Sequence, residues 1–237
     1  DRPEQYAFII NDDGSMAVFH SIRNEEKAGF VKWTTNGRYH SVVSIDDRVF
    51  VATVRNLGSG TNSYVLEELK TTSRLDCSKT YTATSSNNGI FTTSTPFANG
   101  ASLAVLEGNN FIGTFTMATN QINVSAIKLI NTAEIGFSFT SSLKTLPVDA
   151  SVAGGPLTGE PRAITRVNLD LISTLSVSVN TIPLIIQGVT DTVTNDEMAF
   201  NPFTGKKEFR LLGYSRDPRV EITQTAPLDL QINGMIV

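Results

Sequence analysis

The sequence predicts an all-β protein, and three observations support this prediction. From Tyr6 onward, short runs rich in β-branched and aromatic residues alternate with turns of Gly, Asn and Asp. Several of these runs alternate in side-chain character with the two-residue period of a strand. No segment shows a convincing helical period over more than two turns. We therefore expect an antiparallel meander, similar to a propeller blade, together with small β-barrel or sandwich domains.

The first predicted domain, residues 1–72, is the meander. Turns at Asp12-Asp13-Gly14, Asn36-Gly37-Arg38 and Asp46-Asp47 separate its runs, because Asn, Asp and Gly tolerate left-handed backbone geometry. In the run at 48–55, alternate residues are apolar on both faces, which predicts a central strand. The sequence shows no internal repeat that would indicate a complete propeller.

Two further domains are expected, joined by a linker. Residues 73–147, which are rich in Ser, Thr and Asn between short strands, predict a small barrel or sandwich. Residues 148–162 contain prolines and glycines and predict a connecting loop. Residues 163–237 predict a C-terminal β-domain, although 163–174 could also form a helix. Pro218 and Pro227 should lie at strand ends, since proline cannot donate to a ladder.

Composition narrows the class of protein. The net charge of −4 argues against a nucleic-acid-binding or membrane-surface module, because both favour basic patches. Cys77 is the only cysteine, which excludes an internal disulfide and predicts a small buried side chain. Trp33, the only tryptophan, is expected in the core. No run is long enough to span a membrane and none resembles a signal peptide. The first residue is not Met, and we expect a piece of a longer polypeptide.

The sequence offers no set of residues typical of catalysis. Its two histidines, His20 and His40, both fall inside predicted strands, and no nucleophile-elbow pattern is present. Asp12-Asp13-Gly14-Ser15 lacks the alternating acidic ligands of a calcium loop and predicts a hairpin turn. Glu25-Glu26 and Glu67-Glu68 are adjacent pairs, whose side chains point to opposite faces on a strand. We therefore predict that the protein is not an enzyme and has no catalytic, cofactor-binding or metal-binding residues.

Basic residues gather near the C-terminal end of the sequence, and two interpretations stay open. They are Lys206, Lys207, Arg210, Arg216 and Arg219. They could form a basic surface for nucleic acid or an acidic partner, or they could be the solvated side of a hairpin. The negative net charge favours the second interpretation.

Three segments of the chain carry a family resemblance. The first is GFVKWTTNGRYHSVVSIDDRVFVATVR with the later YVLEEL, and the second is AEIGFSFTSSLKTLPVD. The third is GEPRAITRVNLDLISTLSVSVN with LLGYSRDPRVEITQTAPLDLQINGMIV. In this order they resemble the C-terminal half of the tail-nozzle family of short-tailed phages, often called tail tubular protein B. Phe139 stands where the family commonly has tyrosine, Asp229 stands where it commonly has proline, and residues 78–125 match only in pattern.

The resemblance implies a structural virion protein without catalytic activity. It implies a homo-oligomeric ring that contacts other tail or adaptor proteins and lines a channel through which DNA passes without specific binding. A mildly acidic chain suits this role, because an acidic wall does not hold phosphate backbones. Such a protein is made in the host cytoplasm, has no membrane anchor and resides in the phage tail.

Two other classes of function stay open. A receptor- or glycan-binding module could use the Ser/Thr/Asn-rich loops at 58–63 and 84–95, and would need a groove of exposed aromatic side chains. A polysaccharide-degrading enzyme would need two carboxylates about 5–10 Å apart in a cleft.

For ring assembly, Phe50, Val51 and Val54 are the predicted packing residues. Lys206, Lys207 and Arg210 could lie at a salt-sensitive subunit interface.

Overall fold

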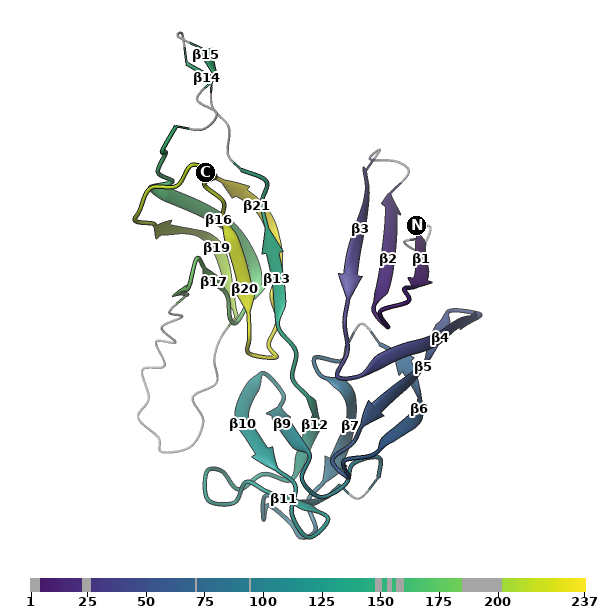
Figure 1. Ribbon diagram of the computed structural model, residues 1–237. Coiled ribbons are helices and arrows are strands. Elements are labelled where there is room, and N and C mark those ends of the chain that lie inside the picture. Colours follow the sequence, from purple (N-terminus) through teal and green to yellow (C-terminus); the bar gives the residue numbers. More distant parts are fainter. Residues whose placement is uncertain are drawn as a thin grey trace. The chain divides into compact units, whose positions relative to one another are not determined.

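The computed structural model describes residues 5–22, 27–70, 72–93, 95–147, 151–152, 155–156, 160–184 and 202–237. These residues form strands and no helix, which confirms the all-β fold class (Figure 1). The strands make several antiparallel sheets, and none of the described sheets closes into a barrel. The chain divides into two compact units, Asp1–Val105 with Ile112–Phe137, and Leu106–Phe111 with Ser138–Val237.

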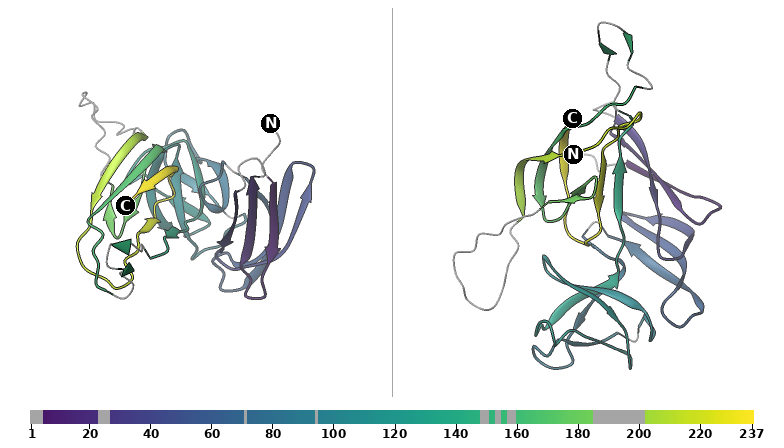
Figure 2. Two further views of the ribbon diagram at one scale, coloured as in Figure 1. Left: turned by 90° about the horizontal axis from the view of Figure 1, so that it is seen from above. Right: turned by 60° about the vertical axis from the view of Figure 1, so that its left-hand side comes forward.

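The first unit begins with two three-stranded sheets. The strands are β1 (Gln5–Ile10), β2 (Met16–Ile22), β3 (Lys27–Trp33), β4 (Arg38–Ile45), β5 (Arg48–Asn56) and β6 (Asn62–Leu69). They pair in the orders β1-β2-β3 and β4-β5-β6, so β5 is central, as predicted. The single meander expected from the sequence is therefore split in two, and Figure 2 shows β1–β3 as a separate layer.

The split occurs at the connection between β3 and β4, which other parts of the unit hold. The Thr35 hydroxyl and the Asn36 N–H donate hydrogen bonds to one carboxylate oxygen of Asp76, at 2.6 and 3.1 Å. The backbone N–H of Tyr39 donates to the Gly14 carbonyl at 2.8 Å. These bonds direct β4 away from β3, so the two strands do not pair as neighbours in one sheet.

The two sheets share one core. It comprises Met16, Val18, Tyr39 and Val51, with Phe8, Ile10, Val42 and Leu69 packed around them. Each sheet therefore has an inner face toward this core and an outer face away from it. Only part of the β1–β3 inner face is covered, because Trp33 is 38% exposed and Tyr6 48% exposed. The prediction that Trp33 lies in the core is therefore wrong; it lies at the end of β3, beyond the shared core.

The rest of the first unit packs around a larger core. The strands around this core are β7 (Asp76–Thr82), β8 (Ile90–Thr92), β9 (Ser102–Glu107), β10 (Asn110–Thr116), β11 (Gln121–Asn123) and β12 (Thr132–Phe137). The end of β9 and the start of β10, Leu106–Phe111, are counted with the second unit. They form a sheet in the order β10-β9-β12-β7 and a pair β11-β8. The core includes Phe91, Phe97, Leu103, Ile122 and Ile135. The two open sheets enclose this core without closing into the barrel that was one predicted alternative.

The second unit contains two principal sheets. Its strands are β13 (Ser141–Lys144), β14 (Ser151–Val152), β15 (Gly155–Pro156), β16 (Arg166–Thr174), β17 (Ser178–Val179), β18 (Ile182–Pro183), β19 (Phe203–Arg210), β20 (Glu221–Gln224) and β21 (Ile232–Ile236). The sheet orders are β13-β20-β17-β18 and β19-β16-β21, and β14 pairs with β15. Alternate residues of β16 are buried, so the strand interpretation of 163–174 is confirmed and the helix is wrong. Pro218 and Pro227 lie outside the strands, as predicted.

The predicted division into 1–72, 73–147, 148–162 and 163–237 stays a prediction. Compactness separates only the two units named above. β13 falls inside the predicted second domain, but it pairs with β20 of the C-terminal part. Within the predicted linker, β14 pairs with β15, and the other residues of 148–159 lie outside the described residues.

Candidate functional site

The outer face of the β4–β6 sheet is the candidate site. Strand pleating places one side chain in two on this face, and the strand register brings Val43 opposite Phe50, Ala52 opposite Leu66 and Val54 opposite Tyr64. Side chains on this face that are more than half exposed are Tyr64 at 74%, Leu66 at 73%, Ile45 at 55% and Val43 at 51%. Together these side chains make an apolar surface that no other described part of the first unit covers.

Ion pairs to Glu68 and one histidine border this surface. Arg48 donates two hydrogen bonds of 2.7 Å to the carboxylate of Glu68, and its guanidinium lies 4.9 Å above the Phe50 ring. The hydrogen bonds from Arg48 lower the pKa of Glu68 and raise the pKa of Arg48 itself. The His40 ring meets the Tyr64 ring edge-on at 5.7 Å. Lys70 also pairs with Glu68 at 3.7 Å, so two cations and one carboxylate lie at this border of the apolar surface.

A second apolar surface lies on the outer face of the β1–β3 sheet. The register places Ala7 opposite Phe19, and Phe19 opposite Phe30, with Ile9 and Ala17 alongside. The Phe19 and Phe30 rings pack with centroids 4.7 Å apart. Phe30 is nevertheless 68% exposed and Ile9 52% exposed.

The outer face of the β19-β16-β21 sheet in the second unit is polar and provides a comparison. Its outer face carries Arg166, Asn168 and Asp170 on β16, opposite Arg210, Glu208 and Lys206 on β19. Only Ile236 on β21 adds a large exposed apolar side chain to this face. Water solvates such a surface readily, whereas the apolar outer faces of the first unit favour contact with another surface.

The predicted packing residues are only partly on the candidate surface. Phe50 and Val54 lie on the outer face of β5 and are half-buried. Val51 points the other way, is fully buried and packs in the shared core, so its assignment to a partner surface is wrong. Tyr64 and Leu66 were not predicted as surface residues, although they alternate with Val65 in the YVLEEL run.

A buried charged cluster lies beneath the inner face of the same sheet. The Arg55 side chain is fully buried and donates to Glu67 at 2.8 Å and to both oxygens of Asp76 at 2.9 and 3.2 Å. Its Nε donates to the Thr53 hydroxyl at 3.2 Å, and Thr53 donates to Glu67 at 3.0 Å. Since Glu67 is on β6 and Asp76 on β7, the cluster fastens the β4–β6 sheet to the next sheet.

The charges of this cluster stabilise one another, as expected for a contact that holds two sheets together. Burial raises the pKa of Glu67, and the charge of Arg55 offsets only part of that shift. Burial acts to lower the pKa of Arg55, but hydrogen bonds to Asp76 and the charges of Asp76 and Glu67 outweigh it and raise the pKa. Burial, with the charge of Glu67, raises the pKa of Cys77 to about 12, so the thiol stays protonated near neutral pH. Cys77 is half-buried against the larger core, close to its predicted role as a small packing residue.

The other sequence candidates are dispersed. His20 stacks on Tyr6 at 4.6 Å in β2, whereas His40 lies in β4. Asp12-Asp13-Gly14-Ser15 forms the predicted hairpin turn, in which Ser15 N–H donates to Asp13 at 2.8 Å. Hydrogen bonds from Lys32 and Ser15 hold the pKa of Asp13 well below its usual range. Glu67 and Glu68 point to opposite faces of β6, and Glu25-Glu26 lies outside the described residues.

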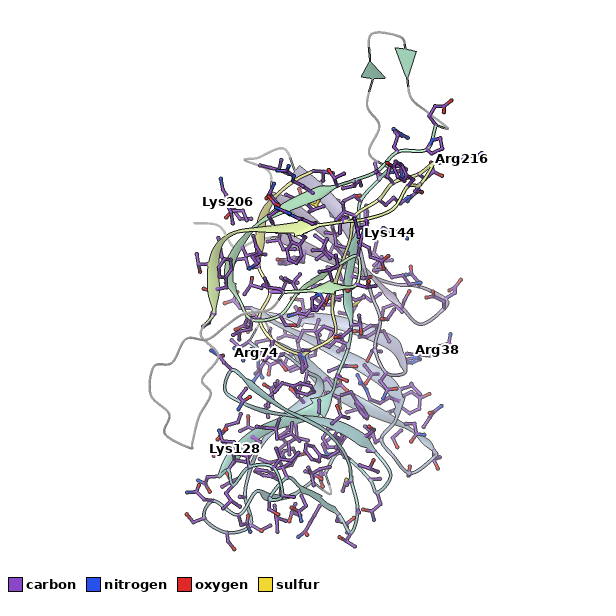
Figure 3. All side chains as sticks on the ribbon, turned by 90° about the vertical axis from the view of Figure 1, so that its left-hand side faces the viewer. Arg38, Arg74, Lys128, Lys144, Lys206 and Arg216 are labelled. Atoms are coloured by element: carbon purple, nitrogen blue, oxygen red, sulfur yellow. The ribbon has the colours of Figure 1, made fainter. Side chains whose placement is uncertain are left out.

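The C-terminal basic residues do not form one patch. Lys206, Lys207 and Arg210 lie on β19, and Arg210 donates to Glu208 at 3.1 Å. Arg216 and Arg219 belong to the segment that leads to β20. Figure 3 shows Lys206 and Arg216 well separated. This arrangement fits solvated side chains better than a basic surface for nucleic acid.

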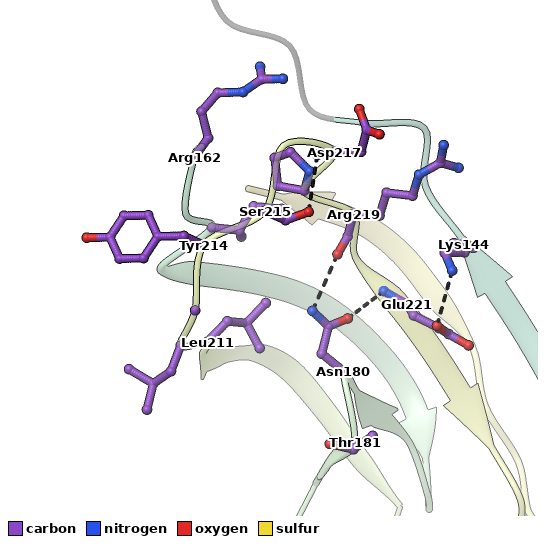
Figure 4. Close-up of a pocket in the computed structure, with 14 residues that line it drawn as sticks. Lys144, Arg162, Asn180, Thr181, Leu211, Tyr214, Ser215, Asp217, Arg219 and Glu221 are labelled. Atoms are coloured by element: carbon purple, nitrogen blue, oxygen red, sulfur yellow. Dashed lines mark hydrogen bonds and ion pairs between the residues drawn. The ribbon is translucent and has the colours of Figure 1, made fainter. Parts of the chain in front are cut away.

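One cavity of about 530 Å³ lies within the second unit. Its lining includes Lys144, Arg162, Asn180, Tyr214, Arg219 and Glu221. Asn180 is fixed, since its amide donates to the Arg219 carbonyl at 3.4 Å and accepts from Glu221 N–H at 2.7 Å. Lys144 and Glu221 pair at 3.7 Å. Figure 4 shows the charged ends of Lys144, Arg162 and Arg219 pointing in different directions, so they do not converge on one anion.

The loops proposed for sugar binding lie elsewhere. Residues 58–63 and the described part of 84–95 belong to the first unit and do not line this cavity. Phe91 and Phe97, which lie in or next to the loop at 84–95, are buried in the core, so neither can line a groove of exposed aromatic side chains.

The described residues show neither a metal-ligand cluster nor a membrane-spanning helix. They contain no group of three or more His, Cys, Asp or Glu side chains placed to hold a metal ion. Nor do they contain a helix with the length and apolar character needed to cross a membrane.

Comparison with known proteins adds no relative. No model of a known protein family matches the chain, and a search of curated proteins finds no match. The functional conclusion therefore depends on the chain's own surfaces and on the sequence resemblance.

Proposed function

We propose that this chain is a structural protein of a bacteriophage tail, part of a nozzle or tubular ring that lines the DNA conduit. The observation that carries the proposal is the apolar outer face of β4–β6, where Tyr64 and Leu66 are more than 70% exposed. Exposed apolar surfaces of this kind are typical of assembly sites. The resemblance of three segments to the tail-nozzle family supplies the kind of assembly.

The free energy that this face could contribute on burial suits a protein that assembles through many contacts. Burying the remaining exposed area of Val43, Ile45, Tyr64 and Leu66 would contribute roughly 4–8 kcal/mol, given about 1.5–3 kcal/mol for a fully buried side chain. Association costs about 4–15 kcal/mol in lost freedom of motion. One such face alone therefore gives weak association, and a ring gains stability from several contacts made together.

The distribution of charge supports a channel that does not bind the DNA passing through it. The net charge is −4, and the basic residues near the C-terminal end are spread over separate segments. Without a basic stripe, phosphate backbones pass without being held.

Electron microscopy of negatively stained protein tests the proposal directly. The protein is incubated with the adaptor or portal proteins of short-tailed phages, and closed rings with an open centre are the expected result. Failure to form rings with any such partner would contradict the proposal. Retention of double-stranded DNA by the protein at physiological salt would contradict the passive conduit.

A receptor- or glycan-binding role is the second candidate, and the cavity of the second unit favours it. Arg162, Arg219 and Tyr214 line it, and each can contact a separate hydroxyl group of a saccharide. Saturation-transfer NMR with neutral and acidic oligosaccharides checks this role. A signal that Arg219→Ala and Tyr214→Ala both remove would support it, and no signal with any saccharide would exclude the cavity as a sugar site.

A further inference from the structure

Asparagine is followed directly by glycine at four places in the chain. The pairs are Asn36-Gly37, Asn88-Gly89, Asn99-Gly100 and Asn233-Gly234. In such a pair the backbone nitrogen of the glycine can attack the side-chain carbonyl carbon of the asparagine, because glycine has no Cβ to shield that nitrogen. The attack closes a succinimide ring and releases the side-chain nitrogen as ammonia. Which pair reacts in the folded protein depends on how firmly each asparagine side chain is held.

The Asn88 side chain is held at both ends. Its amide nitrogen donates to the Thr84 hydroxyl at 2.8 Å, and its oxygen accepts from the Ile90 N–H at 3.0 Å. The N–H of Gly89 donates to the Ile130 carbonyl at 3.1 Å, which ties the glycine nitrogen to another segment. These bonds must break before the glycine nitrogen can reach the side chain, and breaking them slows the reaction.

The Asn99 and Asn233 side chains each make one hydrogen bond within the described part of the chain. The Asn99 oxygen accepts from the Asn120 N–H at 2.7 Å. The Asn233 amide donates to the Asp170 carboxylate at 3.2 Å, and Gly234 lies within β21, opposite Asp170. Both side chains are therefore restrained, although by fewer bonds than the side chain at position 88.

Asn36 differs from the other three asparagines. Its side chain is exposed, and no hydrogen bond joins that side chain to any residue that the structure describes. Its backbone N–H donates to Asp76 at 3.1 Å, and the Gly37 N–H donates at 2.8 Å to the carbonyl of Thr35, a near neighbour. The Asn36 side chain can therefore turn toward the Gly37 nitrogen without losing a side-chain hydrogen bond.

We propose that Asn36 is a site of spontaneous deamidation, at which the Gly37 nitrogen displaces ammonia from the Asn36 side chain. A bond forms between the Gly37 nitrogen and the side-chain carbonyl carbon, and the bond from that carbon to the side-chain nitrogen breaks. The proton of the Gly37 N–H leaves with the ammonia. Water then opens the succinimide ring and leaves either aspartate or isoaspartate, so the reaction needs no oxidant, reductant or enzyme. The inference is independent of the proposed function, because it requires neither assembly nor a partner.

Either product should loosen the connection between β3 and β4. Both products carry a new carboxylate close to Asp76, which accepts hydrogen bonds from the Asn36 N–H and the Thr35 hydroxyl, and like charges repel. Isoaspartate also adds one carbon to the backbone next to Gly37. The backbone has no room there, because a Cβ added to Gly37 would lie 2.3 Å from the Val54 carbonyl oxygen. Deamidation should therefore weaken the hydrogen bonds that hold this connection.

Peptide mapping of the aged protein tests the proposal. The full chain is incubated at mildly alkaline pH, and samples taken over time are digested and analysed by mass spectrometry for conversion of amide to acid. The other three asparagine–glycine pairs are controls within the same sample. A parallel incubation in urea gives the rates in the unfolded chain. Asn36→Gln is the matched variant, because it keeps an amide at this position but does not form a succinimide.

We expect conversion at Asn36 to be at least about threefold faster than at any other pair in the folded protein, since no side-chain hydrogen bond has to break first. In urea the four rates should become similar. The aged protein should unfold at a lower urea concentration than fresh protein, whereas aged Asn36→Gln should keep its midpoint. Faster conversion at another pair, or no conversion at Asn36 while the unfolded chain reacts, would overturn the proposed site. An unchanged midpoint after conversion would overturn the effect on the connection.

Discussion

At the scale of single residues, Arg55 joins several strands of the first unit through a buried charged cluster. It is fully buried between Glu67 and Asp76, and it joins β5 to β6 and β7. A buried guanidinium of this kind is tolerated because every neighbour accepts a hydrogen bond from it. The sequence analysis missed it, although Arg55 continues the alternation of Val51 and Thr53 toward the inner face.

Replacing Arg55 with Met should destabilise the protein by about 3–5 kcal/mol, because two buried carboxylates lose their partner. Urea unfolding followed by circular dichroism measures the change. Arg48→Met is the matched control, since Arg48 also pairs with a glutamate but is 61% exposed. Equal effects of the two substitutions would show that burial of the Arg55 cluster does not matter.

Glu67 should make the free energy of unfolding depend on pH in the range above the ordinary pKa of its carboxyl group. Because burial raises its pKa, the folded state binds its proton more readily than the unfolded state does. Stability should therefore rise as pH falls from neutrality toward 4.5, the ordinary pKa of this group. Glu67→Gln should flatten this rise when unfolding free energies are measured from pH 7 to 5. The same slope in both proteins would refute the assignment. Asp13 and Glu68, whose pKa values are lowered, cost stability only as pH falls below about their ordinary values of 3.8 and 4.5.

At the scale of strands and turns, most strands could be predicted from the sequence, but which strands pair within one sheet could be predicted less well. Alternating runs predict strands because side chains alternate across a sheet, and this rule correctly placed β5 at a sheet centre. It could not show that β3 and β4 belong to different sheets. That break depends on hydrogen bonds from Thr35 and Asn36 to Asp76, a residue some forty positions away. Pattern along the chain also could not reveal that Trp33 reaches past the core.

The turn at Gly37 should tolerate no side chain. Its φ is +140°, and a Cβ there would lie 2.3 Å from the Val54 carbonyl oxygen and 2.9 Å from the Arg55 Cα. We expect Gly37→Ala to destabilise the protein by more than about 2 kcal/mol, since strain and backbone overlap both act. Gly60→Ala is the control, because its φ is +78° but its Cβ would meet open space. Gly60→Ala should lower the free energy of unfolding by about 1 kcal/mol in the same measurement.

At the scale of the whole molecule, the candidate surface was only partly predictable. The sequence indicated a sheet with two apolar faces and suggested Phe50, Val51 and Val54 as residues that pack against a partner. Phe50 and Val54 lie on the outer face, whereas Val51 is buried in the shared core. Which face of the β4–β6 sheet is covered depends on how the β1–β3 sheet packs against it. A local sequence pattern does not predict that packing. The phage-tail assignment stays a proposal that the resemblance and the exposed faces support.

Sedimentation velocity of the unaltered chain over a wide range of protein and salt concentrations tests the central claim most directly. If the apolar outer faces are assembly surfaces, the mean sedimentation coefficient should rise with protein concentration. The rise should persist at high salt, because apolar contacts are not screened. A single monomeric species at every protein and salt concentration would contradict the account.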